Sequence, residues 1–417
     1  MYRLVTFSSL LLFSISFAAK GQVISDSIFE ETIRTVQLYP DFGQLNDVVL
    51  PAAVPLNQQN LKLEFDELSE DYENFILKII RCNADWIVSQ VPEIEYLEDY
   101  NEFQVVNMQP SFNTKVIFTH YSIAIPKTLL SGNYVAQIYR ENAPENVVIS
   151  KRFLVYSEHI NINSGSSKIQ NSINSNRQQI DFKLNYDKER TSYQIENLKV
   201  IIRKNGRWDQ VVTGFKPTHI NSSSGTLEYR LFKPSDQFDG LNEFRFFDMR
   251  SINFRGMNIE RIDKTTTPTT VILNHDEPWS SKGYFDAQDV NGQYVIDHYE
   301  YGGGALEGDY IHTYFVLESG FQYDYDIYII GALTNWKIKD EFKMRYDQDA
   351  QNYYCRPLLK QGYYNYRYAL KKEHSLDEKY VDGNHYRTEN MYEIMVYYRP
   401  VGAWKDELIG YNRLVTK

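Results

Sequence analysis

The sequence contains only two cysteines, Cys82 and Cys355, which lie nearly the length of two domains apart in a chain of 417 residues. Two cysteines can form a disulfide, but the geometry that a disulfide needs cannot be judged from a sequence. Unpaired cysteine is among the most buried residue types. We therefore favour two small, buried, unpaired side chains over a disulfide.

The sequence also lacks the apolar repeat of an amphipathic helix, because no segment of a dozen residues carries a clean helical stripe. Glycine and proline are few, at 21 and 13 residues, whereas 34 Tyr and 23 Phe raise the aromatic content to 15%. Aromatic and β-branched residues favour strands. The chain is therefore predicted to be all-β, and its length indicates two to three domains.

Positive charge is in short supply, since 44 Lys and Arg stand against 55 Asp and Glu and give a formal net charge of −11. Binding to nucleic acid needs clustered Lys and Arg that contact phosphates. The composition therefore argues against nucleic acid as a partner, and equally against adhesion to an anionic membrane surface by charge.

Long apolar runs are absent except at the N-terminus. Arg3 gives a short positive start, Leu4–Ala18 is apolar and serine-rich, and Ala19–Gly21 places small residues where a signal peptidase reads. We expect residues 1–21 to be a secretory signal peptide that is cleaved before Gln22. No cysteine follows this site to carry a lipid, and no later run reaches the ~18 apolar residues that a membrane-spanning helix needs.

Catalytic motifs are absent or weak. The nucleophile-elbow pattern Gly-x-Ser-x-Gly does not occur, and a dinucleotide fingerprint near Gly302 lacks its third glycine. A metal triad of His275–Glu277 with His298 or His312 has loose spacing, and one such match among eight histidines arises easily. Acid pairs that a glycosidase could use are better explained as solvated strand faces: Asp66 with Asp85, and Asp324 with Asp326. We therefore expect no catalytic residue, cofactor or metal.

The most distinctive stretch runs from Phe75 to Trp86. Its apolar residues fall on both faces of an extended strand, which predicts a strand covered on both sides near the centre of a domain. Asn83-Ala84-Asp85 then supplies turn chemistry, and Trp86 follows as a large anchor whose indole N–H needs a partner if it is buried. We interpret this stretch as structural.

Short strand patterns recur along the mature chain and predict three tandem β-sandwiches of immunoglobulin-like size. Asn161–Asn176 is rich in Asn and Ser, Asp263–Thr270 is rich in Thr, and both are expected to be connectors. Asn205-Gly206 suits the turn of a hairpin. The predicted domains are residues 22–157, residues 158–270, and residues 271–417, the last being a connector plus a C-terminal sandwich.

Several stretches resemble the plug protein family of the bacterial type IX secretion system, long treated as a domain of unknown function in Bacteroidetes. In the first domain they are Ile33–Tyr39, Leu63–Leu68 and Ile79–Trp86, and further on they are Asn242–Asp248 and Gly383–Arg399. The family motif here consists of Cys82, Asn83, Asp85 and Trp86, to which the resemblance gives a structural role. Arg81 departs from the family, in which histidine is expected.

The third domain is also similar to glycogen-binding modules of the early-set sandwich class, through Ile327–Trp336 and Gly362–Tyr368. In those modules the residue that matches Trp336 can stack on sugar. A second aromatic residue usually completes the platform, and here only Tyr380 and Tyr386 are near that place. Trp336 is therefore noted as a vestigial sugar contact, with a structural tryptophan as the favoured interpretation.

The resemblance implies a non-catalytic periplasmic protein at the inner side of the outer membrane. It would close the periplasmic end of the very large outer-membrane translocon barrel, SprA, while no substrate passes. This role needs a rigid body of packed β-domains and no cofactor. The alternative is a carbohydrate-binding periplasmic or surface protein that uses the C-terminal domain, and a β-rich glycan hydrolase is a third hypothesis.

Overall fold

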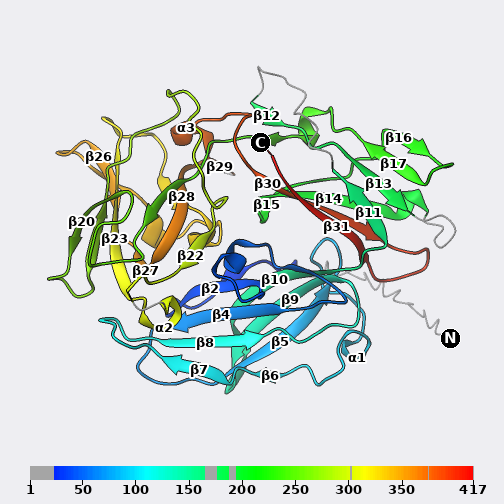
Figure 1. The fold of residues 1–417 in the computed structure, drawn as a ribbon, viewed down its shortest axis with the longest axis horizontal. Helices are drawn as coiled ribbons and strands as arrows, with labels where there is room; N and C mark the ends of the chain where they lie inside the picture. Colours follow the sequence, from blue (N-terminus) through cyan, green and yellow to red (C-terminus); the bar gives the residue numbers. More distant parts are fainter. Residues whose placement is uncertain (1–22, 165–175, 187–193, 301–302, 374, 417) are drawn as a thin grey trace, which may run out of the picture.

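The structure is a computed structural model, and it describes residues 23–164, 176–186, 194–300, 303–373 and 375–416. The expected signal peptide, residues 1–21, lies outside the described residues. Strands dominate, and they form three β-sandwiches grouped around a common centre (Figure 1). In Figure 1 the first sandwich lies at the bottom, the second at the upper right and the third at the upper left. The prediction of an all-β chain of sandwiches is confirmed.

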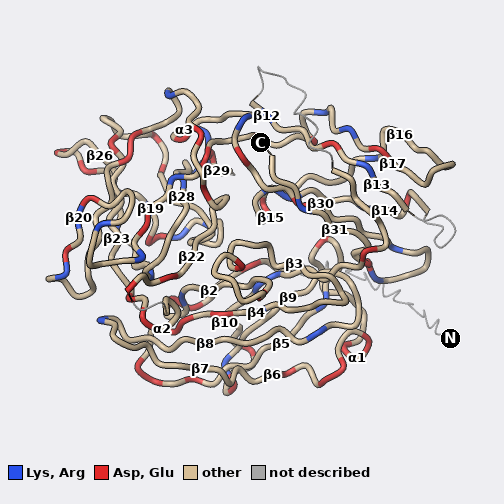
Figure 2. The backbone as a smooth tube through the Cα atoms, in the orientation of Figure 1, with Lys and Arg blue, Asp and Glu red and all other residues tan. Residues whose placement is uncertain are grey.

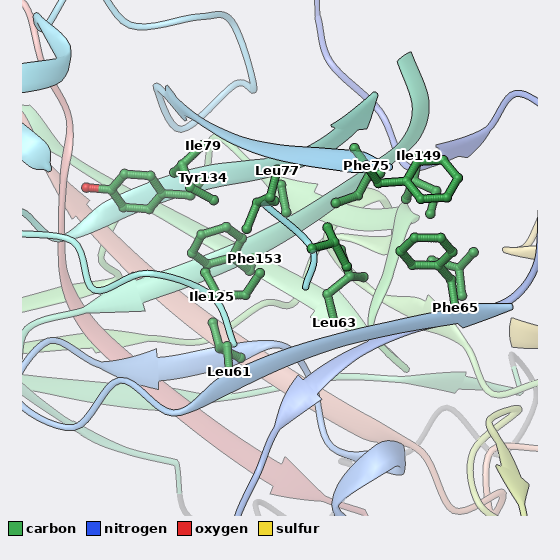
Figure 3. Close-up of a cluster of buried hydrophobic side chains, with 14 of the residues drawn as sticks. Leu61, Leu63, Phe65, Phe75, Leu77, Ile79, Ile125, Tyr134, Ile149 and Phe153 are labelled. Carbon is green, nitrogen blue, oxygen red and sulfur yellow. The ribbon is translucent and has the colours of Figure 1, made fainter. Parts of the chain in front are cut away.

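The first sandwich packs two sheets face to face over an apolar core (Figure 3). One sheet has the order β1-β10-β9-β5-β6, with β3 added in parallel to β10. Its strands are β1 Ser27–Ile28, β3 Ala53–Pro55, β5 Phe75–Cys82, β6 Phe103–Gln104, β9 Gly132–Arg140 and β10 Ala143–Tyr156. The other sheet has the order β2-β4-β8-β7, from β2 Ile33–Pro40, β4 Leu61–Glu67, β7 Asn107–Pro110 and β8 Thr119–Ala124.

Strand β5 is covered on both faces, as its sequence predicts. Phe75, Leu77 and Ile79 are 0–1% exposed and point into the core of the first sandwich (Figure 3). Cys82 and the half-buried Ile80 point the other way, into a separate apolar cluster that includes residues of the second sandwich. The second face of β5 is therefore covered by the second sandwich and not by a further layer of the first sandwich.

The second sandwich is built from two distant parts of the chain. One sheet has the order β11-β13-β17-β16, and the other has the order β15-β14-β30-β31. The strands are β11 Ile160–Asn163, β13 Phe182–Tyr186, β14 Leu198–Lys204, β15 Arg207–Thr213, β16 His219–Asn221, β17 Thr226–Tyr229, β30 Met391–Tyr398 and β31 Glu407–Val415, with a small ribbon of β12 Arg177–Gln178 and β18 Phe238–Asp239. The Asn205-Gly206 hairpin is present, with φ of 50° and 69°.

The hydrogen-bonded sheets do not follow the expected division at residue 270. Strand β30 pairs with β14 along its whole length, so the last strands complete the second sandwich instead of the third. Strand β11, Ile160–Asn163, extends into the segment Asn161–Asn176 that is expected to be a connector. The Thr-rich segment from Asp263 to Thr270 joins two paired strands of the third sandwich, so it is a hairpin loop and not a boundary.

The third sandwich therefore spans residues 241–389. Strand β28 is central to one sheet, where it pairs with β19, β22, β24 and β29, and the other sheet has the order β20-β21-β23-β26-β25, with β27 beside β23. The strands are β19 Arg245–Asp248, β20 Ile259–Asp263, β21 Thr270–Leu273, β22 Tyr294–Ile296, β23 Tyr310–Glu318, β24 Ile327–Ile330, β25 Arg345–Asp347, β26 Asn352–Cys355, β27 Leu358–Lys360, β28 Gly362–Lys371 and β29 Leu376–Asp377.

Helices are short and lie in connections. They are the α-helices α1 Glu93–Tyr96, α2 Gly304–Glu307 and α3 Lys379–Asp382, and the 3-10 helices η1 Leu45–Val49, η2 Ile195–Asn197, η3 Pro234–Asp236, η4 Ala332–Thr334 and η5 Asp340–Phe342. Within the described residues, no helix has the length and apolar character to cross a membrane. Acidic and basic residues are distributed over all three sandwiches (Figure 2).

Candidate functional site at the domain junctions

The family motif forms a tight turn at the end of β5. The Trp86 N–H donates to the Asn83 carbonyl at 2.9 Å, and the Asn83 N–H donates to the Ile87 carbonyl at 2.9 Å. The Asp85 carboxylate accepts the Ile87 N–H at 3.2 Å, the local bond that makes Asp frequent in turns. Trp86 has a φ of 66°, a left-handed conformation that is rare for a bulky residue and is held here by the turn.

Trp86 links the first sandwich to the second. Its ring meets Trp208 of β15 edge-on, with 4.6 Å between ring centroids, and the side chain is 5% exposed. The Arg152 guanidinium lies 5.1 Å from the ring of Trp86 and 5.2 Å from that of Trp208. The Trp86 indole nitrogen has no hydrogen-bond partner among the described residues, so the expected partner is not there. Trp86 therefore anchors by packing and by its cation–π contact with Arg152.

Arg81 fixes the same junction through hydrogen bonds. Its guanidinium is 1% exposed and donates to the Asp406 carbonyl at 2.6 Å and the Ser131 carbonyl at 3.1 Å. The Asp406 carboxylate accepts the Ala84 N–H at 2.9 Å. Burial alone would raise the pKa of Asp406, but its bonds to Arg399 and to Ala84 hold that pKa below the usual value. Arg81, where the resemblance leads us to expect a histidine, is thus a link between the first and second sandwiches.

A second junction joins the first sandwich to the third around Asp66, which is 1% exposed. Its carboxylate accepts hydrogen bonds from Lys360 Nζ at 2.6 Å and from the Tyr310 hydroxyl at 2.8 Å, and it contacts His120 Nδ1 at 2.7 Å. A bulge in β2 turns Thr35, with a φ of 51°, toward the Tyr310 hydroxyl at 2.6 Å.

The charges at this junction shift the pKa values of its acid and its histidine. Burial disfavours the ionised Asp66 carboxyl, but Lys360 and His120 more than compensate and lower its pKa below the usual value. Burial disfavours the protonated His120, yet the hydrogen bonds to Asp66 and Glu64 raise its pKa above the usual value. Both shifts favour the charged forms, which hold the two sandwiches together.

A third junction joins the second sandwich to the third through a buried ion pair. The Arg207 guanidinium of β15 binds the Glu378 carboxylate with two bonds, at 2.7 and 2.8 Å, and both side chains are nearly inaccessible. Arg367 of β28 approaches the same carboxylate at 3.3 Å. Burial would raise the pKa of Glu378, but the two guanidinium groups lower it to about 2. All three pairs of sandwiches are therefore connected by buried polar contacts.

A cavity of about 140 Å³ lies where the three sandwiches meet. Trp336 lies in its wall, with a φ of 58°. One face of its ring is covered by the Arg207 guanidinium, 4.4 Å from the centroid, and its edge contacts Phe244. A Cβ added at Gly292 would lie 2.2 Å from the ring. This packing fits the structural interpretation of Trp336 and leaves little room for a stacked sugar.

The weaker catalytic candidates are not brought together. Asp276 is bound by Arg245, Tyr366 and Tyr368, whereas His275 contacts Glu318 on the surface. Asp66 is buried at a junction and Asp85 is exposed in a turn. Among the described residues, no group of three or more His, Cys, Asp or Glu side chains is placed to hold a metal ion.

Cys82 and Cys355 are both unpaired and buried, in different apolar clusters. The favoured interpretation from the sequence is therefore confirmed. Burial raises the pKa of the Cys82 thiol to about 12, so the thiol stays protonated and unreactive.

The sequence does not single out most of the charged residues at the junctions. Asp66 is predicted to lie on a solvated strand face, and Arg207, Lys360, Glu378 and Asp406 carry no prediction. The available signal was a charged residue within an otherwise apolar alternation, as at Lys360 after Leu358-Leu359. That signal gives no partner, because the partners lie 171 to 325 residues away.

The chain consists of three all-β domains that are joined by buried contacts. It therefore belongs to the class of multidomain β-sandwich proteins, and its described part contains no evident active site. The family model described as "Type 9 secretion system plug protein 1st domain" matches residues 33–157, from the first residue of β2 to the residue after β10. The first sandwich of this chain is therefore similar to the first domain of the type 9 secretion system plug family. The Cys82–Trp86 motif lies within the matched residues.

Among the solved structures that are similar to this chain is one whose similarity extends over nearly the whole chain. It is the crystal structure of a hypothetical protein from Parabacteroides merdae, with 28% sequence identity and a TM-score of 0.86. The similarity covers 94% of this chain and 99% of that chain. No curated protein matches the sequence. The arrangement of three sandwiches is thus shared with a protein known from a crystal.

Proposed function

We propose that this protein is a periplasmic plug, which closes the periplasmic end of the outer-membrane translocon barrel SprA while that barrel is idle. The observation that carries the proposal is the match of residues 33–157 to the first domain of the type 9 secretion plug family. The expected signal peptide supports export, and the mature protein is proposed to sit at the inner side of the outer membrane.

The junctions support a mechanical role. A plug must keep its shape under contact with a large partner, and each pair of sandwiches here is joined by nearly inaccessible side chains. Breaking one partner of a buried ion pair leaves an uncompensated charge, which makes separation of the domains costly. We infer that the molecule acts as one rigid body and does so without catalysis.

The test is recovery of the protein with its partner from its own cells. A tagged copy is extracted from membranes in mild detergent, and the bound proteins are identified and quantified. We expect one giant outer-membrane barrel in stoichiometric amount. Deletion of the gene should then let large antibiotics enter, and expression of the untagged protein should restore exclusion.

The matched control is a tagged periplasmic protein of similar size and charge, extracted in the same way. Recovery of the barrel with both baits, or with neither, would contradict the proposal. Recovery of glycan or of sugar-uptake proteins in its place would favour the carbohydrate-binding alternative, with Trp336→Ala as the variant to examine.

A further inference from the structure

The wall of the central cavity contains more cationic side chains than carboxylates. Three cationic side chains and one carboxylate line it: Lys151 and Arg152 from β10, Arg203 from β14, and Asp26. This excess is local, because the whole chain has a formal net charge of −11. The third sandwich contributes the polar side chains of Asn335 and Gln293 to the same wall.

Two of the cations already have carboxylate partners. Arg152 binds Asp26 with two guanidinium bonds at 2.7 and 2.9 Å, and Arg203 binds Glu393 through two bonds at 2.5 and 2.7 Å. These pairs leave Lys151 as the cavity's uncompensated charge.

Lys151 has no carboxylate within 4.0 Å in the part of the chain that the structure describes. Its Nζ donates to Asn335 Oδ1 at 2.5 Å, a neutral acceptor. Burial lowers the pKa of Lys151, Asp26 partly opposes this, and the nearby Lys339, Arg152 and Lys337 lower the pKa further. Lys337 donates to Ser27 Oγ at 2.8 Å, so its charge is not paired there either.

We propose that the cavity binds a small tetrahedral oxyanion, of the class of inorganic phosphate, with Lys151 Nζ as the principal contact. Lysine binds phosphate as a point charge with three donors, and the Asn335 and Gln293 amides supply further donors at the wall. A volume of about 140 Å³ is near that of a cavity that holds benzene, so it accommodates such an anion but no folded peptide segment.

The anion would stabilise the contact between the first and third sandwiches, because its contacts come from both domains. Lys151 belongs to the first sandwich, and Asn335 and Gln293 belong to the third. A ligand that binds only the folded protein stabilises it by RT ln(1 + L/Kd), where L is the free ligand concentration. Phosphate should therefore raise the midpoint of thermal unfolding, and above the dissociation constant the rise should follow the logarithm of the phosphate concentration.

The experiment titrates inorganic phosphate into the purified mature protein at constant ionic strength set with sodium chloride. Binding is followed by calorimetry and by the unfolding midpoint, which we expect to rise by about 2 °C at a phosphate concentration about ten times the dissociation constant. Lys151→Met keeps the apolar stem and removes the charge. It should weaken phosphate binding at least tenfold and abolish the shift.

Lys78→Met is the matched control, since Lys78 also lies in the first sandwich and its side chain is 40% exposed beside Glu93. It should bind phosphate like the unchanged protein. Lys337→Met removes a neighbouring charge at an exposed position and should weaken binding a few-fold, which tests the site even if Lys151→Met does not fold. Absence of saturable binding to the unchanged protein, or equal binding by Lys151→Met, would overturn the proposal.

Discussion

At the residue scale, the buried Asp66–Lys360 pair makes the clearest prediction. Asp66→Asn keeps the shape of the side chain but leaves the Lys360 ammonium buried without a counter-charge. Removing one partner of a buried pair costs about 3–5 kcal/mol. Urea unfolding should show a loss of this size in the free energy of unfolding. Asp326→Asn, which removes the partner of Lys343 on the surface, should leave that free energy almost unchanged.

His120 predicts a pH dependence at the same junction. Its pKa is raised in the folded protein, so its contribution to stability is fully present below the unfolded value of 6.5 and is lost as pH rises through the folded pKa. His120→Gln keeps a hydrogen-bonding side chain that does not titrate. The free energy of unfolding, measured by urea from about pH 6 to about pH 8, should therefore fall more steeply in the unchanged protein than in the variant.

Other groups also titrate between about pH 6 and about pH 8, and the comparison with His120→Gln removes their contribution. Burial raises the pKa of Glu243 to about 7, and this group contributes equally to both proteins. The difference between the two pH profiles therefore reports His120 alone. Identical slopes would show that the pKa of His120 is the same in the folded and the unfolded protein, and a shallower fall in the unchanged protein would show that His120 is neutral at the junction.

At the scale of one element, the β14–β15 hairpin depends on a glycine. Gly206 has a φ of 69°, and an added Cβ would meet nothing closer than 3.9 Å, so only backbone strain opposes a side chain. Gly206→Ala should destabilise the protein by about 1 kcal/mol. Gly283→Ala is the control, because Gly283 has no positive φ and an added Cβ lies in open space. An equal effect of the two changes would refute the turn argument.

The strands themselves could be predicted from the sequence, whereas their partners could not. Phe75–Cys82 is the strand that its apolar residues predict, and it ends where the turn residues Asn83-Ala84-Asp85 begin, since apolar patterning and turn residues are local signals. Met391–Tyr398 is a mostly apolar run that also forms a strand, but its neighbour β14 precedes it by almost 200 residues. The apolar pattern of a strand shows that one of its faces is buried, but it does not show which distant strand covers that face.

The same limit explains why a structural role could be predicted for the motif but its role as a link between two domains could not. Trp86 looks like an ordinary anchor in the sequence, and its partner Trp208 belongs to a different domain. The pair predicts a coupling that a double-mutant cycle measures. Trp86→Ala and Trp208→Ala together should cost less than the sum of the single changes, by about 0.5–1.5 kcal/mol. Strict additivity would show that the two domains are not coupled through these rings.

At the scale of the whole molecule, the last 27 residues of the chain contain two strands of the second sandwich, so the second sandwich and not the third depends on them. A protein that ends at Asn390 lacks β30 and β31, which supply two of the four strands of one sheet in the second sandwich. Their buried Tyr392, Ile394 and Val396 belong to the core of that sandwich, at 0% exposure. The core of the third sandwich contains no residue beyond Val381. Truncation should therefore unfold the second sandwich and spare the third.

Amide hydrogen exchange distinguishes this outcome from the one that chain order alone predicts. In the truncated protein, we expect β13 and β17 to lose protection, while β23 and β28 keep theirs. A division of the chain at residue 270 predicts the reverse, because β30 and β31 would then belong to the third sandwich. Removing only residues 407–417 provides the graded control, since β30 then remains paired with β14 but becomes an edge strand. Protection in β13 and β17 should fall less in that protein, because half of the lost strand pairing is retained and the buried face of β30 still covers the core.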